Sequence, residues 1–476
     1  MIRIFSQYVS PKSLLLVILG GGLTILGLLC GAWLRFWGNT TDFESYVEAP
    51  DFAFQALIFT ITLQVCFYYS DLYDLRAIRA RRDQLICLGQ SLGAASLFLG
   101  LMYFIFPTLL IGRGVFFIST ALVATFFVGA RTALDRAWQA AAPRQRVLIL
   151  GSQQLALTAA RELMSRDDLN IDLVGFLEPG SGGSPGPAQL NGNGAGLFDR
   201  PVLGTMADLE PVVQQHQVSR IVIAMEDSRC FMPIRDLVKL RVQGVRVEDV
   251  HSTVSSLTGR IWLSMVRPSW FIFSDGFHRS RSTLVAKRII DLAFGLLGLV
   301  LSSPILLLTA IAIRLDSRGP VIFSQTRVGL KGKCFKVLKF RSMRVGAEAA
   351  TGPQWAQEND ERVTRVGRYL RKFRLDELPQ FLNVIRGEMS FVGPRPERPC
   401  FVNRLREVIS YYDERHSVRP GATGWAQVQY TYGATIEDAC TKLEYDLFYL
   451  KNMSVFFDLV IILKTLRIVL TGKGGR

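Results

Sequence analysis

One short segment of the chain places two neighbouring carboxylates beside a dense group of cations. Its sequence is Leu375-Asp-Glu-Leu-Pro-Gln380, and it follows basic residues that recur every three or four positions from Arg362 to Lys372. That spacing aligns the cations on one side of a helix, where they could contact a diphosphate or lipid headgroups. Without a neighbouring motif, the same stripe would be interpreted as ordinary surface. Asp376 taken alone suits a helix N-cap, with Glu377 in the first turn.

Three further motifs present single cations from rigid or strand-like surroundings. Lys339-Phe-Arg-Ser-Met343 follows short strand-like runs separated by glycines, which suits a phosphate-facing surface, although a solvated charged face is the alternative. Gly393-Pro-Arg-Pro-Glu397 and Arg419-Pro-Gly-Ala-Thr-Gly-Trp425 are loops fixed by glycine and proline. Each of these loops presents one arginine, an arrangement that suits ordered recognition of a phosphate or a base.

Composition restricts the class of protein. The 476 residues are 49% hydrophobic and only 20% charged, which excludes disorder over most of the chain. Residues 279–476 hold 32 basic and 18 acidic residues, and therefore +14 of the net charge of +15. Such a basic domain should have anionic partners, namely phospholipid headgroups, phosphorylated substrates or nucleic acid. Seven scattered cysteines without a CxxC pair and four histidines argue against a secreted disulfide protein, a zinc hydrolase and a histidine triad.

The N-terminal 135 residues predict four transmembrane helices. Uncharged stretches of about the length that a bilayer requires occupy residues 13–34, 52–70, 84–112 and 114–130. An uncleaved signal sequence and buried soluble helices are the alternatives for these stretches. Arginine and lysine precede the first stretch and follow the second and the fourth, while Asp42, Glu44, Glu48 and Asp51 follow the first. The positive-inside rule therefore predicts that both ends of the bundle are cytosolic.

Residues 140–265 predict a Rossmann-like α/β domain. Strand-like runs at 146–151, 171–178 and 221–226 alternate with helical patterns at 155–165, 206–217 and 234–242. The first turn is Gly151-Ser-Gln-Gln-Leu-Ala156, in which Gln153 takes the place of the glycine that lets a pyrophosphate approach. We therefore predict that this domain uses neither NAD nor another nucleotide in catalysis. The Gly/Pro/Ser-rich segment 179–193 is interpreted as a surface loop.

A fifth apolar stretch, residues 292–313, has features of a helix that enters a membrane and returns. Ser303 and Pro304 lie near its middle, and proline removes a helical hydrogen bond there. Basic residues flank both ends, and a straight fifth span would move the +14 domain to the outside. A broken, re-entrant helix over about 287–314 fits these features, with a straight span as the alternative.

Taken in order, the motifs resemble the bacterial monotopic phosphoglycosyl transferases. The resemblance covers about residues 280–470 and rests on seven segments: Lys287–Asp291, the Ser-Pro pair, KFRSM, LDELPQ, GPRPE, RPGATGWAQV and Glu444–Lys451. The complete architecture resembles the large polyprenyl-phosphate hexose-1-phosphate transferases that initiate exopolysaccharide or O-antigen synthesis. It implies a multi-pass protein of the bacterial inner membrane, with the catalytic α/β domain of residues 280–476 facing the cytosol.

The resemblance also implies a reaction. Hexose 1-phosphate, from glucose or galactose, would pass from a UDP-sugar to undecaprenyl phosphate with release of UMP, and Mg²⁺ would be required. Asp376 matches the nucleophile, which also lies on the metal, and Glu377 completes the acidic pair. Other matching positions surround the donor: Lys339, Arg341, Arg371, Pro394, Arg395, Pro396 and Arg419. The neighbouring cations are expected to lower the pKa of Asp376 and keep it ionised. Phe373-Arg374 departs from the small polar residues common in the family.

Two other classes of protein remain as alternatives. A membrane-bound nucleotide-sugar dehydratase would share the four spans and a nucleotide-binding fold, but residues 280–476 contain neither a second glycine-rich loop nor a Tyr-xxx-Lys pair. A non-catalytic membrane scaffold would not need the acidic pair among these motifs. The expected partners are the lipid bilayer, the two substrates and a second copy of the chain in a homodimer, with no nucleic acid.

Overall fold

The computed structural model divides the chain into two compact units, Tyr8–Glu248 and Asp249–Arg476. It describes residues 2–4, 7–9, 11–73, 81–141, 145–151, 154–166, 170–178, 200–225, 232–266, 268, 271, 274, 276, 277, 279–347, 362–430, 433 and 435–471. Two short strands, β1 (Ile2–Ile4) and β2 (Gln7–Val9), pair at the N-terminus.

The four apolar stretches of the N-terminal region all form helices. They are α1 (Pro11–Arg35), α3 (Phe52–Tyr69), α4 (Arg81–Ile105) and α5 (Arg113–Ala141). Each of them is long and apolar enough to cross a membrane, and so is α11 (Arg281–Asp316) of the second unit. The acidic loop contains a further short helix that the sequence did not predict, α2 (Thr40–Val47).

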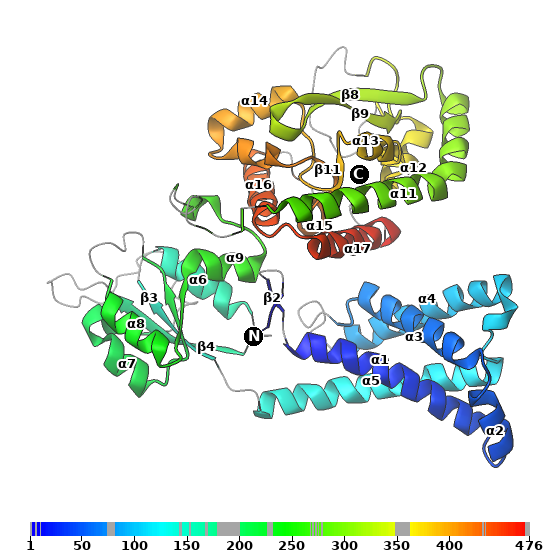
Figure 1. Ribbon diagram of the computed structural model, residues 1–476, viewed down its shortest axis with the longest axis horizontal. Helices are drawn as coiled ribbons and strands as arrows, with labels where there is room; N and C mark the ends of the chain where they lie inside the picture. The colour runs from blue at the N-terminus through cyan, green and yellow to red at the C-terminus, as the bar shows by residue number, and fades with distance from the viewer. Residues whose placement is uncertain are drawn as a thin grey trace. The chain divides into compact units, whose positions relative to one another are not determined.

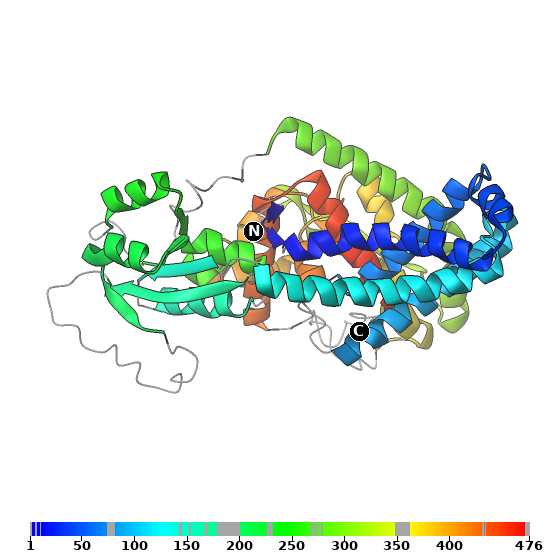
Figure 2. The ribbon, with the colours of Figure 1, turned by 90° about the horizontal axis from the view of Figure 1, so that it is seen from below.

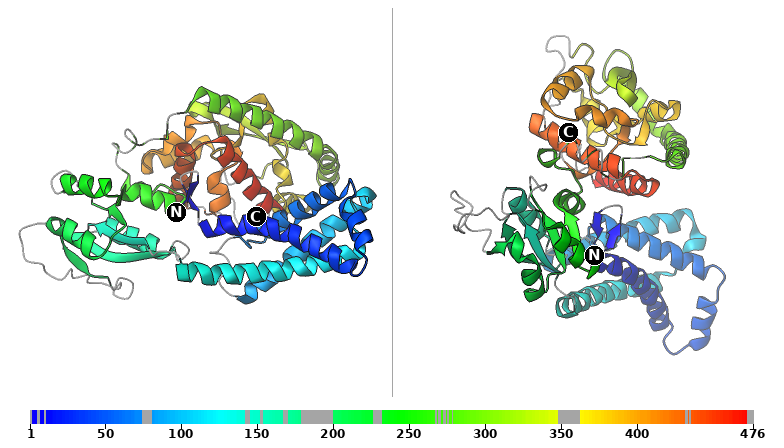
Figure 3. Two further views of the ribbon diagram at one scale, coloured as in Figure 1. Left: turned by 60° about the horizontal axis from the view of Figure 1, so that its bottom comes forward. Right: turned by 60° about the vertical axis from the view of Figure 1, so that its left-hand side comes forward.

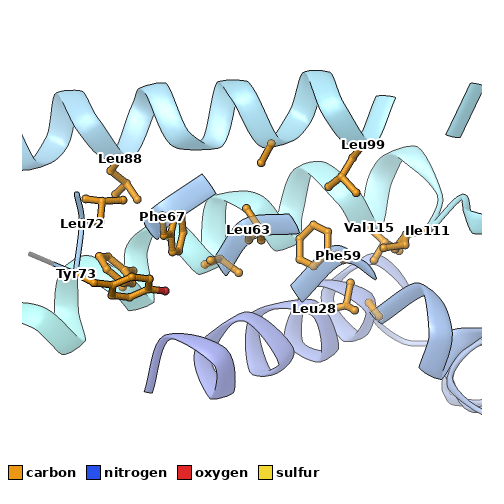
Figure 4. Packing of buried hydrophobic residues seen from close by; sticks show 14 of the residues in the cluster. Leu28, Phe59, Leu63, Phe67, Leu72, Tyr73, Leu88, Leu99, Ile111 and Val115 are labelled. Carbon is orange, nitrogen blue, oxygen red and sulfur yellow. The ribbon is translucent and has the colours of Figure 1, made fainter. Parts of the chain in front are cut away.

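Aromatic and aliphatic side chains from these helices share one buried core. Phe59, Leu63 and Phe67 of α3 lie at its centre, against Leu28 of α1 and Leu99 of α4 (Figure 4). The outer faces of the helices remain apolar and exposed, as with Leu97 and Phe104 of α4 and Phe117 of α5. A protein surface of this composition is suited to contact with lipid rather than water.

Helices α1 and α5 run side by side, as Figure 2 and Figure 3 show. Glycines at two adjoining turns of α1 allow the close approach: a Cβ on Gly27 would lie 2.5 Å from Cγ2 of Val123, and one on Gly31 would lie 2.1 Å from Oγ of Ser119. Small residues are the usual means by which membrane helices approach one another closely.

The middle domain is a five-stranded sheet in the order β5-β4-β3-β6-β7. The first strand, β3 (Gln145–Leu150), lies between β4 (Ile171–Glu178) and β6 (Arg220–Ile223) and pairs in parallel with both. Helices α7 (Leu209–Gln215) and α8 (Ile234–Val242) pack together on one face of the sheet. Helix α6 (Gln154–Met164) packs separately from them, against β3 and β4 (Figure 1). The α/β prediction for this region is confirmed.

Two strands of this sheet were not predicted, β5 (Val202–Thr205) and β7 (Arg246–Asp249). Gly151 follows β3 with a φ of +122°, and a Cβ there would lie 2.3 Å from the carbonyl oxygen of Ala224. This glycine therefore permits the close approach of the strand ends. Gln153 and segment 179–193 lie outside the described residues, and the prediction about nucleotides stays a prediction.

The second unit contains two small two-stranded sheets together with several helices. The long hairpin of β8 (Ile322–Val328) and β9 (Cys334–Phe340) is antiparallel, whereas β10 (Ser390–Val392) and β11 (Gly421–Thr423) pair in parallel. The helices that follow α11 are α12 (Arg365–Lys372), α13 (Gln380–Arg386), α14 (Pro399–Val408), α15 (Trp425–Gln429), α16 (Ile436–Lys451) and α17 (Val455–Thr471).

Helix α11 is continuous through Pro304 and bends, so the predicted break is a bend within one helix (Figure 1). Proline has no N–H to donate to the carbonyl of Val300. The hydroxyl of Ser303 donates to that carbonyl instead, at 2.7 Å, and the hydroxyl of Ser302 donates to the carbonyl of Gly298 at 2.6 Å. The two serines thus satisfy carbonyls at the bend.

The segment before α11 belongs to the second unit. Helix α9 (Val250–Thr258) is followed by a short irregular stretch and a 3₁₀ turn, Leu263–Met265, which contact α15 and α16. The carbonyl of Gly259 accepts the indole N–H of Trp425 at 2.7 Å, and the backbone N–H of Leu263 donates to Oε1 of Glu444 at 2.9 Å. The structure therefore divides the chain between Glu248 and Asp249, whereas the sequence placed residues up to 265 in the middle domain.

Candidate active site

The β8–β9 hairpin positions the first cation of the site. Lys339 lies near the end of β9, and Asn383 of α13 is hydrogen-bonded to the backbone of this strand. The fully buried amide of Asn383 accepts the backbone N–H of Leu338 at 3.0 Å and donates to the carbonyl of Lys336 at 2.8 Å. Helix α13, which directly follows the acidic motif, is thereby attached to the strand that carries Lys339.

The acidic pair lies in a tight turn. Residues Leu375–Glu377 form a single 3₁₀ turn, and α13 begins only at Gln380. The prediction that Asp376 is a helix N-cap is therefore wrong. Arg374, immediately before the turn, has a φ of +54°, a left-handed conformation that is uncommon for residues other than glycine. This conformation at Arg374 reverses the chain between α12 and the acidic turn, and backbone outliers of this kind gather at functional sites.

Glu377 is bound by three cations. Its Oε1 accepts from Nζ of Lys339 at 3.0 Å and from Nη2 of Arg395 at 2.5 Å, while its Oε2 lies 3.8 Å from Nη1 of Arg374. Burial by itself would raise the pKa of Glu377, but Arg395, Lys339 and Arg374 hold it well below its usual range. Glu377 is therefore an ionised anchor that fixes these cations in space.

Asp376 is different from its neighbour. Its side chain is buried, and within the described part of the chain its carboxylate makes no hydrogen bond or ion pair. Burial and the charge of Glu377 raise the pKa of Asp376 to about 6, against the opposing effect of Lys339, Arg371 and Arg395. The cations thus act in the expected direction, but burial and the charge of Glu377 outweigh them, so the expectation of a lowered pKa for Asp376 was wrong. A free, desolvated carboxylate beside a fixed cluster of cations is suited to nucleophilic attack or metal binding.

Two further arginines that were predicted to bind substrate lie on the neighbouring KFRSM segment and on α12. Arg371 donates from Nε to the hydroxyl of Ser342 at 3.0 Å and is close enough to Asp376 to influence its pKa. Arg341 is turned the other way: its two terminal nitrogens donate to the carbonyls of Arg318 and Ser317 at 2.9 and 2.7 Å. The structure thus brings Arg371 to the acidic pair and attaches Arg341 to the C-terminal end of α11.

The loop after β10 carries Arg395 between two prolines. The carbonyl of Pro394 accepts the backbone N–H of Gly421 at 2.9 Å, and the carbonyl of Pro396 accepts Nη1 of Arg327 at 3.1 Å. The prolines and these bonds hold Arg395 against Glu377. Arg419 donates from Nε to the carbonyl of Gly387 at 3.0 Å, and this bond ties the second arginine loop to the end of α13.

Sequence reasoning missed several residues that support this arrangement. Neither Asn383 nor Arg327 was among the residues predicted to form the site. Lys287 forms a buried ion pair with Asp458 at 2.6 Å and also donates to the carbonyl of Val392 at 2.9 Å. Their partners lie far away in sequence, so that no local spacing could have revealed these contacts.

The donor set fits Mg²⁺ in the manner usual for phosphate-transferring sites. Mg²⁺ is commonly held by one or two carboxylates together with substrate phosphates and water, without a complete protein cage. The described residues contain no group of three or more His, Cys, Asp or Glu side chains that could form such a cage. The carboxylate of Asp376, buried without a cation of its own, provides the one ligand that this mode of binding requires.

Comparison with known proteins also separates the chain after residue 248. The model of the family described as "Bacterial sugar transferase" matches residues 282–472, and that of a family described as "CoA-binding domain" matches residues 69–248.

Three curated relatives illustrate the similarity. The exopolysaccharide production protein PSS of Rhizobium leguminosarum bv. phaseoli is 43% identical over 201 residues, which are 40% of this chain and 98% of that protein. The UDP-glucose:undecaprenyl-phosphate glucose-1-phosphate transferase of Xanthomonas campestris pv. campestris is 28% identical over 97% of this chain and 94% of its own.

The third relative is the UDP-N-acetylgalactosamine-undecaprenyl-phosphate N-acetylgalactosaminephosphotransferase of Aeromonas hydrophila. It is 48% identical over 190 residues, which are 40% of this chain and 45% of that protein. The match thus spans less than half of this relative. The family model, the near-complete coverage of the Rhizobium protein and the geometry around Asp376 and Glu377 agree, and the chain belongs to the bacterial sugar transferase family.

Proposed function

We propose that the protein transfers hexose 1-phosphate from a UDP-sugar to undecaprenyl phosphate, giving undecaprenyl-diphosphate-sugar and UMP. The observation that carries this proposal is the asymmetry of the acidic pair. Glu377 is saturated by Lys339, Arg395 and Arg374, while the buried carboxylate of Asp376 is free beside them. Such a site can bind a diphosphate through its cations and attack it with a carboxylate.

The reaction divides into two displacements on one phosphorus atom. In the first, an oxygen of Asp376 forms a bond to the β-phosphorus of the donor while the bond from that phosphorus to the bridging oxygen breaks and UMP leaves. In the second, a phosphate oxygen of undecaprenyl phosphate attacks the same phosphorus, and the acyl phosphate bond to Asp376 breaks. Each step exchanges one P–O bond for another, so neither an oxidant nor a further donor is needed.

The residues divide this work according to their contacts. Lys339, Arg371 and Arg395 lie where they can neutralise the non-bridging oxygens of the diphosphate, and Glu377 keeps Lys339 and Arg395 in position. Mg²⁺, held by Asp376 and the phosphate oxygens, would supply additional charge neutralisation when bound. Arg341, which is bound to the end of α11, supports the fold of this region rather than the donor itself.

The identity of the sugar follows less directly from the chain. The Xanthomonas relative is named for glucose and the Aeromonas relative for N-acetylgalactosamine, and the complete architecture is matched by the former. We therefore propose glucose as the hexose, or galactose, which the resemblance described above also implies. UMP release from membranes given undecaprenyl phosphate and, in turn, UDP-glucose, UDP-galactose and UDP-N-acetylgalactosamine would decide among these donors.

The proposed acceptor requires the site to lie at a membrane. Helices α1, α3, α4 and α5 have spanning length, and the exposed face of α11 carries Ile289, Leu296, Val300, Leu307 and Leu308. We propose that α11 bends at Pro304, enters the inner membrane and returns, which leaves the catalytic unit in the cytosol. We also propose a homodimer, to be tested by the molecular mass of the detergent-solubilised protein.

Mass spectrometry of enzyme quenched with UDP-sugar in the absence of undecaprenyl phosphate tests the mechanism. We expect a hexose-phosphate adduct on the peptide containing Asp376, together with ping-pong kinetics. The Asp376→Asn variant should form no adduct, while Asp413→Asn, which alters a surface carboxylate outside the site, serves as the matched control. Intersecting-line kinetics without an adduct would refute the covalent intermediate, and the absence of UMP release with every donor would refute the transfer itself.

A further inference from the structure

The loop that presents Arg395 is held from its inner side by a buried arginine. Arg415 lies in the 3₁₀ turn Tyr412–Ser417, where its side chain is 7% exposed. Its Nη2 donates to the backbone carbonyl of Arg395 at 2.9 Å, and its Nη1 donates to the hydroxyl of Tyr412 at 2.6 Å. The guanidinium therefore bonds to the backbone of the residue whose side chain reaches Glu377.

A carboxylate from another element fixes this guanidinium. Nη2 of Arg415 lies 2.9 Å from Oδ2 of Asp446, whose side chain is 2% exposed. Asp446 lies on α16, a helix of sixteen residues whose N-terminus is closed by a capping box between Thr435 and Asp438. Because one partner of a buried ion pair is costly to leave alone, Asp446 keeps Arg415 in place and α16 supplies a rigid support for both.

The neighbouring carbonyls are held as well. Arg327, on β8, donates to the carbonyl of Pro396, while Lys287 donates to the carbonyl of Val392. The carbonyl of Arg395 itself is bound by Arg415. Fixing this carbonyl fixes the peptide plane after Arg395 and so limits the directions in which its side chain can leave the loop.

We propose that Arg415, held by Asp446, is a positioning residue for sugar-phosphate transfer: it directs the side chain of Arg395 to Glu377 through the Arg395 backbone. The proposal deepens the proposed function and rests on it for the activity that is measured. Among the described residues, neither Arg415 nor Asp446 makes a hydrogen bond or ion pair with Glu377 or Asp376, so the influence passes through Arg395.

Geometry explains why lysine would be a poor substitute for this arginine. The guanidinium meets a carbonyl, a carboxylate and a hydroxyl with nitrogens in one plane. A lysine ammonium retains the charge that Asp446 requires but is a compact donor without that planar fork. Arg415→Lys therefore tests the position of Arg395 while keeping the charge of the buried pair, and Asp446→Asn tests the support of Arg415 with little change in side-chain shape.

A double-mutant cycle with Arg395→Gln separates positioning from a general loss of stability. Arg415→Lys alone should lower kcat/KM for the UDP-sugar on the order of tenfold to a hundredfold, since displaced catalytic groups act poorly. In the Arg395→Gln background the same change should cause little further loss. Asp446→Asn should behave like Arg415→Lys. The control, Arg406→Lys, alters an exposed arginine paired with Asp413 and should leave kcat/KM unchanged. Fully additive losses would overturn the proposal.

A structure of the full-length Arg415→Lys variant decides the same question without activity. We expect Nη2 of Arg395 to move away from Oε1 of Glu377, a pair that is 2.5 Å apart in the wild-type chain. An unchanged contact in the variant would overturn the proposal even if activity had fallen. Conversely, a wild-type protein that releases no UMP would refute the proposed function, while this structural comparison would still decide the role of Arg415.

Discussion

Replacing Lys287 with methionine should destabilise the second unit by about 3–5 kcal/mol, because the change leaves a buried carboxylate without its cation. Nζ of Lys287 lies 2.6 Å from Oδ2 of Asp458, and the two side chains are 9% and 2% exposed. Methionine keeps a similar length and stays apolar. The pair joins the N-terminal part of α11 to α17, and so its loss affects the contact between these two helices.

The size of the effect follows from what remains around the carboxylate. The hydroxyl of Tyr449 still donates to Oδ1 of Asp458 at 2.8 Å, but the carbonyl of Val392 also loses the donor that Lys287 supplied. For a unit of this size, 1 kcal/mol corresponds to about 2–4 °C in Tm, so we expect a fall of roughly 6–20 °C. The double variant Lys287→Met/Asp458→Leu should recover much of the loss, since no charge is then buried alone.

The pH dependence provides a second measurement. Burial raises the pKa of Asp458, while Lys287 lowers it, and removal of Lys287 therefore raises it further. A carboxyl with a higher pKa in the folded than in the unfolded state binds its proton more tightly when folded. The variant should thus gain stability relative to wild type as pH falls through the raised pKa towards the unfolded value of about 3.9.

Thermal unfolding of the purified full-length protein in detergent would measure both effects. It would be followed by tryptophan fluorescence between pH 5 and 8. Arg406→Lys, which changes only an exposed ion pair, is the control. A Lys287→Met protein that unfolds within 2 °C of the control, using the same conversion, would refute the reasoning. A stability difference that widens at low pH would refute the assignment to Asp458.

Asp376→Asn should lower UMP release by at least about a thousandfold with little change in Tm, as assayed with the preferred UDP-sugar, because the amide cannot attack phosphorus. Pro304→Leu should restore the N–H that the carbonyl of Val300 lacks and straighten α11; cysteine labelling from both sides of the membrane would then find residues beyond 330 on the outer side, and unchanged labelling would contradict this. Gly31→Leu should destabilise the helices of the first unit by about 1–3 kcal/mol in thermal unfolding, because a side chain there meets Ser119 of α5. Gly22→Leu, where space is open, should not.

The sequence could predict the elements that have strong periodicity or length. The four apolar runs became α1, α3, α4 and α5, and the buried strand at β3 was correctly placed, because these patterns exclude other local structures. By contrast, β5 and β7 have only four residues each and lie at the edges of the sheet, where alternation is too brief to be recognised. Pairing partners rather than local pattern determine such strands.

The sequence predicted which residues lie near the acidic pair better than it predicted where each of their side chains is bound. Lys339, Arg371 and Arg395 were expected near the acidic pair and lie there, yet Arg341, two positions beyond Lys339, bonds to the end of α11. In a continuous strand, Arg341 and Lys339 would lie on the same face. Because β9 ends at Phe340, strand alternation does not determine the direction of Arg341. The pKa of Asp376 is raised mainly by burial and by the charge of Glu377, and only the folded turn determines both.

The stretch from α9 to Leu263 determines which helices of the second unit would bear a force applied at the N-terminal end of that unit. Its N-terminal end, Asp249, caps α9 by accepting the backbone N–H groups of His251 and Ser252. Beyond α9, force would pass through Gly259 into Trp425 and through Leu263 into Glu444, before it could reach α11. Tension applied at Asp249 is therefore delivered to α15 and α16, the second of which carries Asp446, and a catalytic fragment that begins at residue 280 would lose that connection.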